Sequence, residues 1–385
     1  MALSSVSTPS GGQIVRINHH PLPAGSINCQ YTLSSFHYGT AGGRKIYLQA
    51  GLHADEVPGV LVLHHLRAML EQAEAEGKLR AEIVVVPIAN PIGLSQTFMH
   101  DQLGRFDFAT GANFNRHYPD LAERLLPLVR STLTNDAAHN QRVIRAAMAQ
   151  LLDAEKMNTP LEAMRVALMR LAHDAEIVID LHCDFESVLH IYTAADYQEQ
   201  AEKLGRYMEA EVILVADVLG GACFDEMLFK PWLYLQKQLG HQFPIPPSCF
   251  ATTIELRGET DVSHQYALKD AHAIYHFLCS QGAILQEAPS LPSAKCKPTP
   301  TPGSATIYAP EAGVLVFFGK PGDRVKQGDV VCEIINPISG AVQRIVSPVD
   351  GVMYTHRNLR YATRGMELAK VAGAVAIRSG DLLGA

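Results

Sequence analysis

The chain has 385 residues, of which 47 % are hydrophobic and 18 % charged, and its formal net charge is −7 at pH 7 with histidine neutral. This composition is typical of a globular protein and excludes a disordered chain. The negative charge argues against nucleic acid and against a membrane surface as partners. No apolar run approaches the roughly 20 residues that cross a bilayer. The length favours one large and one small domain.

Two features of the sequence bear on its location in the cell. Residues 1–12 lack the basic start and the apolar core of a signal peptide. The seven cysteines are scattered and form no C-x-x-C pair, which favours free thiols in a reducing compartment. We therefore expect a cytoplasmic protein.

Between about residues 45 and 280, short apolar runs alternate with segments of helical periodicity. The expected strands are 45–50, 83–88, 177–181, 188–192, 212–215 and 250–254, and the expected helices lie near 57–76, 141–173 with a break at Thr159 and Pro160, 197–209, 225–239 and 263–281. Continuously apolar strands are typical of a sheet that is covered on both faces. We therefore predict an α/β domain over residues 1–287, with a mixed β-sheet flanked by helices.

The composition of the chain changes after this domain. Residues 288–303 are rich in Pro, Ser and Thr and are predicted to form a linker. In residues 304–385, short strands alternate with Gly and Pro, and a weak repeat relates 309–314 to 347–352. Two such units are expected to pair into a small β-sandwich or barrel. The segment resembles biotinyl/lipoyl carrier domains, but its loop 336–341 has no lysine to modify, so we expect an accessory, non-carrier role.

Candidate metal ligands stand at the ends of two apolar strands. His53 and Glu56 follow the strand 45–50 and are three residues apart, so a turn at a helix start can direct both side chains to one point. His182 directly follows the strand 177–181. Two imidazoles and one carboxylate are the ligands of a hydrolytic zinc centre that keeps one position for water. We therefore predict one Zn²⁺ per chain at these residues, although another divalent ion has similar ligand preferences.

Three further features surround the predicted metal site. Asp180 shares a strand face with His182, so it either supports that imidazole or stabilises a loop. Glu255, at the end of the last expected strand, is a candidate general base, with a salt bridge to Arg257 as the alternative. The loop 104–116 contains Arg and Asn side chains that suit a carboxylate ligand.

The order of these motifs resembles the succinylglutamate desuccinylase/aspartoacylase family, a branch of the zinc carboxypeptidase fold. The motifs that carry the resemblance are G-x-H-x-x-E at residues 51–56, N-P-x-G at 90–93, Arg105, Asn115 with Arg116, D-L-H at 180–182 and T-I-E at 253–255. The resemblance covers roughly residues 40–280. Many bacterial deacylases of the family also carry a C-terminal β-domain similar to the one expected here.

The resemblance implies a role for each candidate residue. His53, Glu56 and His182 would bind zinc, Glu255 would be the base and proton shuttle, Asn115 and Arg116 would hold the substrate α-carboxylate, and Arg105 would polarise the scissile carbonyl and stabilise its oxyanion. The chain departs from the family at Ala54, where Gly is frequent, and at residues 113–114, where Asp-Leu is frequent. The gap between Arg105 and Asn115 is also longer than usual.

These features together predict a zinc-dependent amidohydrolase. We expect it to remove the acyl group from an N-acyl amino acid or a related small N-acyl compound by attack of metal-activated water. The alternatives are a metallocarboxypeptidase that acts on peptides and a catalytically silent binding or scaffold protein. The complete set of ligands and base argues against the silent protein. The sequence does not identify the acyl group or the amino acid, and it leaves a homo-oligomer and the role of the β-domain open.

Overall fold

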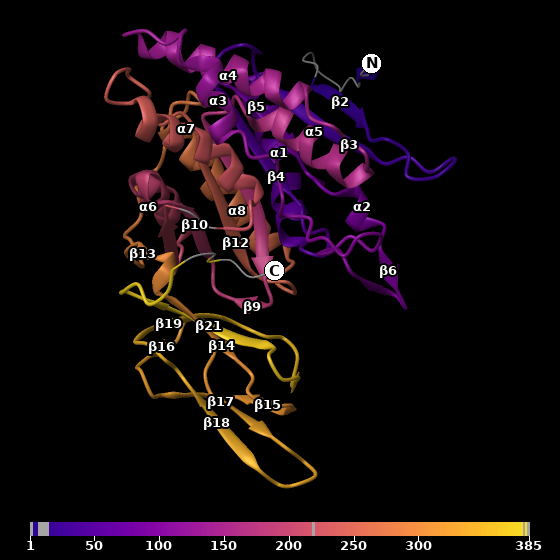
Figure 1. Cartoon of the computed structure of the whole chain (residues 1–385), viewed down its shortest axis with the longest axis vertical. Helices are drawn as coiled ribbons and strands as arrows, with labels where there is room; N and C mark the ends of the chain where they lie inside the picture. The colour runs from indigo at the N-terminus through magenta and orange to yellow at the C-terminus, as the bar shows by residue number, and fades with distance from the viewer. Residues whose placement is uncertain (1–2, 7–14, 218–219, 380–381, 383–385) are drawn as a thin grey trace.

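The computed structural model describes residues 3–6, 15–217, 220–379 and 382, and it consists of an α/β part and a smaller all-β part (Figure 1). The helices are α1 (Pro58–Ala75), α2 (Pro91–Leu94), α3 (Ala122–Val129), α4 (Ala137–Asp153), α5 (Pro160–Ala172), α6 (Gln198–Met208), α7 (Phe224–Leu239) and α8 (His264–Ser280). The strands of the α/β part are β1 (Leu3–Val6), β2 (Arg16–Pro21), β3 (Thr32–Tyr38), β4 (Lys45–Ala50), β5 (Glu82–Val86), β6 (Thr97–Phe98), β7 (Asp101–Gln102), β8 (Ile177–Asp184), β9 (Glu186–Ser187), β10 (His190–Ala194), β11 (Val212–Ala216) and β12 (Phe250–Gly258). Those that follow are β13 (Thr299–Pro300), β14 (Ser304–Tyr308), β15 (Gly313–Phe317), β16 (Arg324–Val325), β17 (Val330–Ile335), β18 (Val342–Val346), β19 (Gly351–His356), β20 (Tyr361–Ala362) and β21 (Glu367–Gly373).

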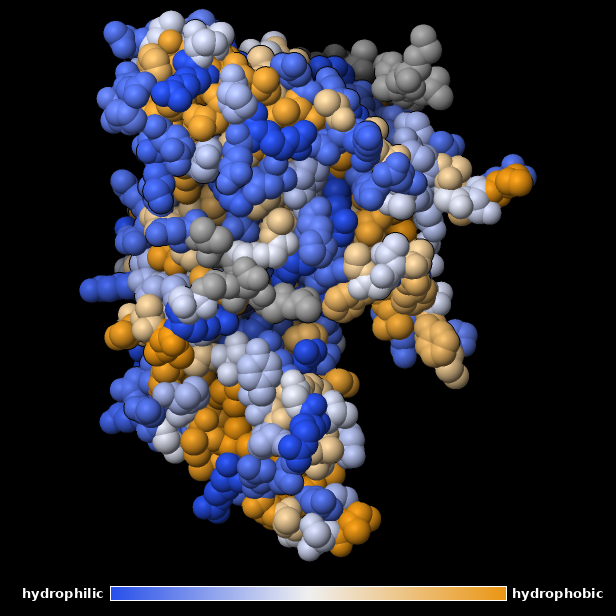
Figure 2. Space-filling model, in the orientation of Figure 1, coloured by the Kyte–Doolittle hydropathy of each residue, from blue (hydrophilic) through white to orange (hydrophobic). Residues whose placement is uncertain are grey.

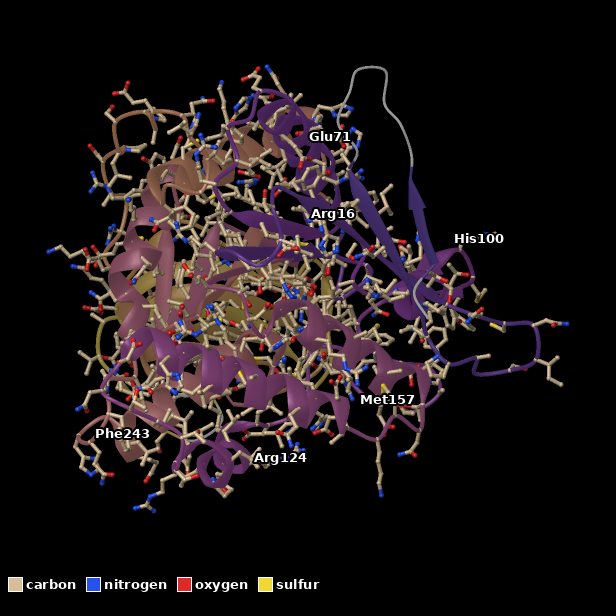
Figure 3. The ribbon with its side chains drawn as sticks, turned by 90° about the horizontal axis from the view of Figure 1, so that it is seen from above. Arg16, Glu71, His100, Arg124, Met157 and Phe243 are labelled. Carbon is tan, nitrogen blue, oxygen red and sulfur yellow. The ribbon has the colours of Figure 1, made fainter. Side chains whose placement is uncertain are left out.

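The α/β part is built on one ten-stranded mixed sheet. Its strand order is β1-β2-β3-β5-β4-β8-β12-β10-β11-β13, and β4, β8 and β12 are parallel neighbours in the middle. Helices α1, α6 and α8 pack together, and α3, α4, α5 and α7 form a second group. Seen from above, Glu71 of α1 and Arg124 of α3 lie toward opposite sides of the molecule (Figure 3). The predicted mixed sheet flanked by helices is confirmed.

The apolar runs of the sequence form the centre of this sheet. In β8 the residues 177–183 are all buried, as expected of a strand covered on both faces. Trp232 of α7 is fully buried and packs in the same core. The expected break between two helical segments is the start of α5, where Thr159 and Glu162 form a capping box and Pro160 occupies the first turn.

Some expected elements differ from those observed. The sheet begins before residue 45, because β2 and β3 add antiparallel strands that the expectation omitted. The sequence of β2, RINHHP, is half-buried and polar, so it lacks the apolar run by which the other strands were recognised. The strand expected over 188–192 is β10, which starts at His190, because the backbone N–H of Val188 instead donates to Tyr354 O of the all-β part. Most of residues 1–12, on which the signal-peptide expectation rests, lie outside the described residues.

The all-β part is a sandwich of two sheets, as predicted. One sheet has the order β14-β21-β19-β16, the other has the order β18-β17-β15-β20, and an apolar cluster lies between them. Strand β9 of the α/β part also pairs with β19, so one sheet of the sandwich includes residues from both parts. The turn 336–341 joins β17 to β18, at the place where a carrier domain would present its lysine.

The segment 288–303 lies against the α/β part. The Tyr207 hydroxyl donates to Pro289 O at 3.2 Å, Arg206 Nη2 donates to Leu291 O at 3.2 Å, and β13 pairs with β11. The face shown in Figure 2 is hydrophilic over much of its area. Among the described residues, no helix is both long and apolar enough to cross a membrane.

Candidate metal centre

The site lies where β4, β8 and β12 end at the same edge of the sheet. His53 stands in the turn after β4, His182 lies near the end of β8, and Glu255 lies near the end of β12. His182 and Glu255 are register partners in their two parallel strands. Side chains at paired positions of neighbouring strands share one face of the sheet. The sheet therefore brings an imidazole and a carboxylate from distant segments to one side of the site.

The turn between β4 and α1 places His53 next to Glu56. It begins at Gly51, whose φ is +66°, a conformation that favours glycine. The backbone N–H of Glu56 donates to His53 O at 3.1 Å, which closes the turn. Asn90 supports it from outside, because its Nδ2 donates to Leu52 O at 2.9 Å. The N-P-x-G motif thus has a structural role next to the site.

Three donor groups converge in this turn. Glu56 Oε1 lies 2.7 Å from His53 Nδ1, and Glu56 Oε2 lies 2.8 Å from His182 Nδ1. Ligand atoms of all three residues lie within 4.8 Å of one another, and the residues are 2–4 % exposed. This is the only such group of three among the residues that the structure describes. Two nitrogens and one carboxylate oxygen are a donor set that fits zinc.

The electrostatics of the two imidazoles agree with cation binding. Burial lowers the pKa of His53 to about 4, which keeps the ring in the neutral form that binds metals. Burial also disfavours charge on His182, but Asp180 and Glu56 outweigh it and raise the pKa of that ring above its usual range. A metal cation bound at Nδ1 would replace only the proton on the side of Glu56, because Asp180 faces the other ring nitrogen, Nε2.

Each imidazole has a second contact on the side away from Glu56. Asp180 Oδ2 lies 3.0 Å from His182 Nε2, so of the two roles left open for Asp180 the structure shows the contact with the imidazole. Asn113 Oδ1 lies 2.9 Å from His53 Nε2. Such contacts fix the ring orientation and the tautomer of a metal-binding histidine. The sequence analysis noted residue 113 only as a departure from the family and gave Asn113 no role at the site.

Glu255 lines the same pocket as the three donors, and its side chain is half-buried there. Burial raises its pKa to about 8, with a further contribution from the negative charge of Glu56. Its Oε2 has no hydrogen-bond partner within the described part of the chain. The alternative partner Arg257 pairs with Asp270 instead, because a β-bulge after Glu255 gives Arg257 a φ of +68° and turns it away.

Arg105 reaches the donors because its loop passes very close to the turn after β4. Ala54 N donates to Gly104 O at 3.0 Å, and a Cβ at Gly104 would lie only 2.3 Å from Asp55 N, so only glycine fits there. Arg105 Nη1 then lies 3.0 Å from Glu56 Oε1. The guanidinium is therefore placed beside the carboxylate of the donor cluster.

Asn115 and Arg116 line another side of the pocket. Asn115 Oδ1 accepts from Phe224 N at 2.9 Å, which holds the residue against the start of α7 and leaves its Nδ2 as the donor. Arg116 Nη1 donates to Asn115 O at 2.7 Å. The Arg116 side chain lies against Gly221, where a Cβ would approach its Cδ to 2.6 Å.

The structure brings all the sequence-predicted site residues into one pocket, which is lined by His53, Glu56, Arg105, Asn115, Arg116, His182 and Glu255. The sequence analysis did not anticipate that the β-sandwich also contributes to the lining, through Arg357, Glu367 and Lys370. Tyr192 lines the pocket as well. Burial raises the pKa of the neighbouring Cys183 thiol, which disfavours the thiolate that a nucleophile needs.

Comparison with known proteins is consistent with this geometry. The model of the succinylglutamate desuccinylase/aspartoacylase catalytic domain matches residues 42–217. A search of the curated proteins finds no match.

Two solved structures from Shewanella are similar over nearly the whole chain. The structure of a protein of the succinylglutamate desuccinylase/aspartoacylase family from Shewanella amazonensis SB2B is 27 % identical, has a TM-score of 0.82, and aligns over 92 % of this chain and 98 % of its own. A second, from Shewanella frigidimarina NCIMB 400, is 25 % identical with a TM-score of 0.81, over 93 % and 97 % of the two chains. The ectoine utilisation protein EutE (DoeB) from Ruegeria pomeroyi shares the fold at 14 % identity. Its TM-score is 0.67, and the alignment covers 96 % of this chain and 98 % of the EutE chain.

Proposed function

Because the chain belongs to the succinylglutamate desuccinylase/aspartoacylase family, we propose that it is a zinc-dependent amidohydrolase. Its substrate would be an N-acyl amino acid or a related small N-acyl compound, whose amide bond it cleaves with water. One observation carries the proposal: the donors His53, Glu56 and His182 share a pocket with Glu255, a half-buried carboxylate on the strand adjacent to that of His182.

His53, Glu56 and His182 would hold the metal through two ring nitrogens and the carboxylate. Zinc bound there would supply a Lewis acid and would lower the pKa of water toward neutrality. Asn113 and Asp180 would orient the two rings, because their side-chain oxygens lie 2.9 and 3.0 Å from the respective Nε2 atoms.

Glu255 is the proposed general base and proton shuttle. Its side chain lines the pocket beside the three donors, and Oε2 has no protein partner in the described structure, so no other group of the protein engages this oxygen. A carboxylate of raised pKa can take the proton of that water and return it to the leaving nitrogen.

The cationic side chains would orient the substrate. Arg116 and the Nδ2 group of Asn115 are proposed to hold its α-carboxylate, because a guanidinium binds a carboxylate through two parallel hydrogen bonds. Arg105 lies beside Glu56 and is proposed to meet the negative charge that develops on the carbonyl oxygen.

A substrate panel with the zinc-loaded protein tests the proposal. We expect hydrolysis of N-acetyl or N-succinyl amino acids, measured as release of the free amine, and no release from blocked dipeptides. Hydrolysis of the dipeptides alone would instead support a metallocarboxypeptidase. No hydrolysis of either class would contradict the proposal and favour a binding protein.

A further inference from the structure

The two sheets of the sandwich differ in what covers their outer faces. The outer face of β14-β21-β19-β16 lies against the α/β part, in an apolar cluster that includes Tyr354 of β19 and Tyr192 of β10. The other sheet, β18-β17-β15-β20, lies at the end of the molecule away from the α/β part (Figure 1). Its inner face packs in the core of the sandwich, so its outer face is the one that solvent reaches.

The register of this sheet shows which side chains point outward. In β15, Leu315 belongs to the core of the sandwich, whereas Val314 and Val316 on either side of it point to the opposite face. Residues that pair with these two, or that continue the alternation, share their face. We call this outward set the distal face, and it consists of Val314, Val316, Phe318, Val330, Glu333, Ile335, Val342, Arg344, Val346 and Tyr361.

The distal face is apolar where a solvent-facing sheet is usually polar. An antiparallel sheet with one solvated face normally alternates apolar residues toward the core with polar residues toward water. On the distal face all side chains except Glu333 and Arg344 are apolar, and all of these apolar side chains except Ile335 are 36–61 % exposed. A contiguous exposed apolar surface of this kind marks a site of interaction with another molecule.

The charge of the distal face fits a second copy of the chain. Arg344 Nε lies 3.1 Å from Glu333 Oε1 on the neighbouring strand, so the face has no net charge, and covering it leaves neither charge unpaired. The whole chain carries a net charge of −7, so its copies repel each other except where neutral surfaces meet. An anionic membrane or a nucleic acid would instead need a cationic face.

The size of the distal face indicates a weak dimer. Four strands about 4.8 Å apart and about 17 Å long span a flat area of roughly 300 Å², to which the protruding side chains add. A stable interface buries about 800 Å² on each partner, and transient interfaces bury less. We therefore expect dimers that form at micromolar concentrations and exchange with monomers.

We propose that the distal face is an interface between two copies of this chain. The copies pack face to face through their β18-β17-β15-β20 sheets and are related by a two-fold axis, with the side chains of the two sheets interdigitated. Their α/β parts then lie at opposite ends of an elongated dimer. The pocket is lined from the other sheet of the sandwich, so dimerisation leaves it open, and the inference does not depend on the proposed hydrolase activity.

Sedimentation velocity of the full-length protein, from low micromolar to several hundred micromolar concentrations, tests for the dimer. We expect the weight-average mass to rise toward that of two chains. A monomer at every concentration would overturn the proposal. Small-angle X-ray scattering of the concentrated sample then tests the shape. The maximum dimension should be close to that of two chains placed end to end, and a compact dimer with its α/β parts in contact would overturn the assignment to the distal face.

Variants assign the association to this surface. Val316→Lys places a cation beside its register partner Glu333, which the fold tolerates, but it brings two like charges into the dimer and should raise the Kd of dimerisation by at least about 10-fold. Tyr361→Ser removes a large apolar side chain at the edge of the sheet and remains informative if the lysine variant does not fold. Ile27→Lys is the matched control, since Ile27 is 92 % exposed in the α/β part. A wild-type Kd in the folded Val316 and Tyr361 variants would overturn the proposal.

Discussion

The two sides of the pocket are built in different ways. On the sheet side, His53 and His182 each contact Glu56 through one ring nitrogen and a further side chain through the other. On the sandwich side, Arg357 is held by stacking and one backbone contact, and its terminal nitrogens have no partner in the described structure. The comparison shows that the strand ends carry the three donors and Glu255, whereas the sandwich adds charged side chains to the wall of the same pocket. The predictions below test this division.

The largest effect is expected at Glu255. Glu255→Gln removes the proposed base but keeps the size of the side chain, so kcat should fall by about 10²- to 10⁴-fold. Metal content, measured by elemental analysis, should stay at the wild-type level, because Glu255 is not among the three donors. Turnover near that of the wild type would exclude Glu255 as the base.

The second largest effect is expected on KM, when the proposed contact of Arg116 with the substrate α-carboxylate is removed. Arg116→Ala should raise KM by about 10- to 100-fold for every substrate that is hydrolysed, because a charge-assisted contact is lost. Steady-state kinetics measure this change. The control Arg124→Ala removes an arginine that pairs with Glu155 away from the pocket, and it should leave KM unchanged. A KM equal to that of the wild type would exclude Arg116 from binding the α-carboxylate.

A smaller effect is expected on zinc affinity when Asp180, which contacts the metal-binding residue His182, is changed. Asp180→Asn weakens the contact with His182 Nε2 and should lower zinc affinity by about 10- to 100-fold, measured by competition with a chelator. Asp174→Asn is the control, because Asp174 pairs with Lys45 at the far end of the strands. Equal zinc affinity in Asp180→Asn and the wild type would show that Asp180 does not support the metal site.

The smallest effect is expected on the free energy of unfolding, when Tyr354 at the junction of the α/β part and the all-β part is changed. Tyr354→Phe removes the contact of the hydroxyl with Ser304 Oγ at 2.8 Å and should lower the free energy of unfolding by about 1 kcal/mol. Urea denaturation measures this change, and Tyr308→Phe, at an exposed position, is the control. A loss of zinc in Tyr354→Phe would contradict the division, since the sandwich should not determine metal binding.

The sequence predicted the sheet side better than the sandwich side. His53, Glu56 and His182 stand at the ends of apolar strands, and such strands place their ends together in a sheet, so local patterns sufficed to select them. Asn113 was missed because its contact with His53 joins a loop to a turn, and no periodicity marks such a pair.

Arg357 could not be found in this way. It lies in a separate domain, and its position next to Phe185 depends on the pairing of β9 with β19. Strand β9 has two residues, which is too short to leave a pattern in the sequence. The same limit applies to β2, whose half-buried polar residues resemble a loop.

The central claim is that His53, Glu56 and His182 bind one metal ion. The most direct test is the zinc content of the purified protein, compared with that of the His53→Ala/His182→Ala variant after both are incubated with zinc and desalted. The account predicts about one zinc per chain in the wild type and none in the variant. No zinc in the wild type, or equal amounts in both proteins, would contradict it.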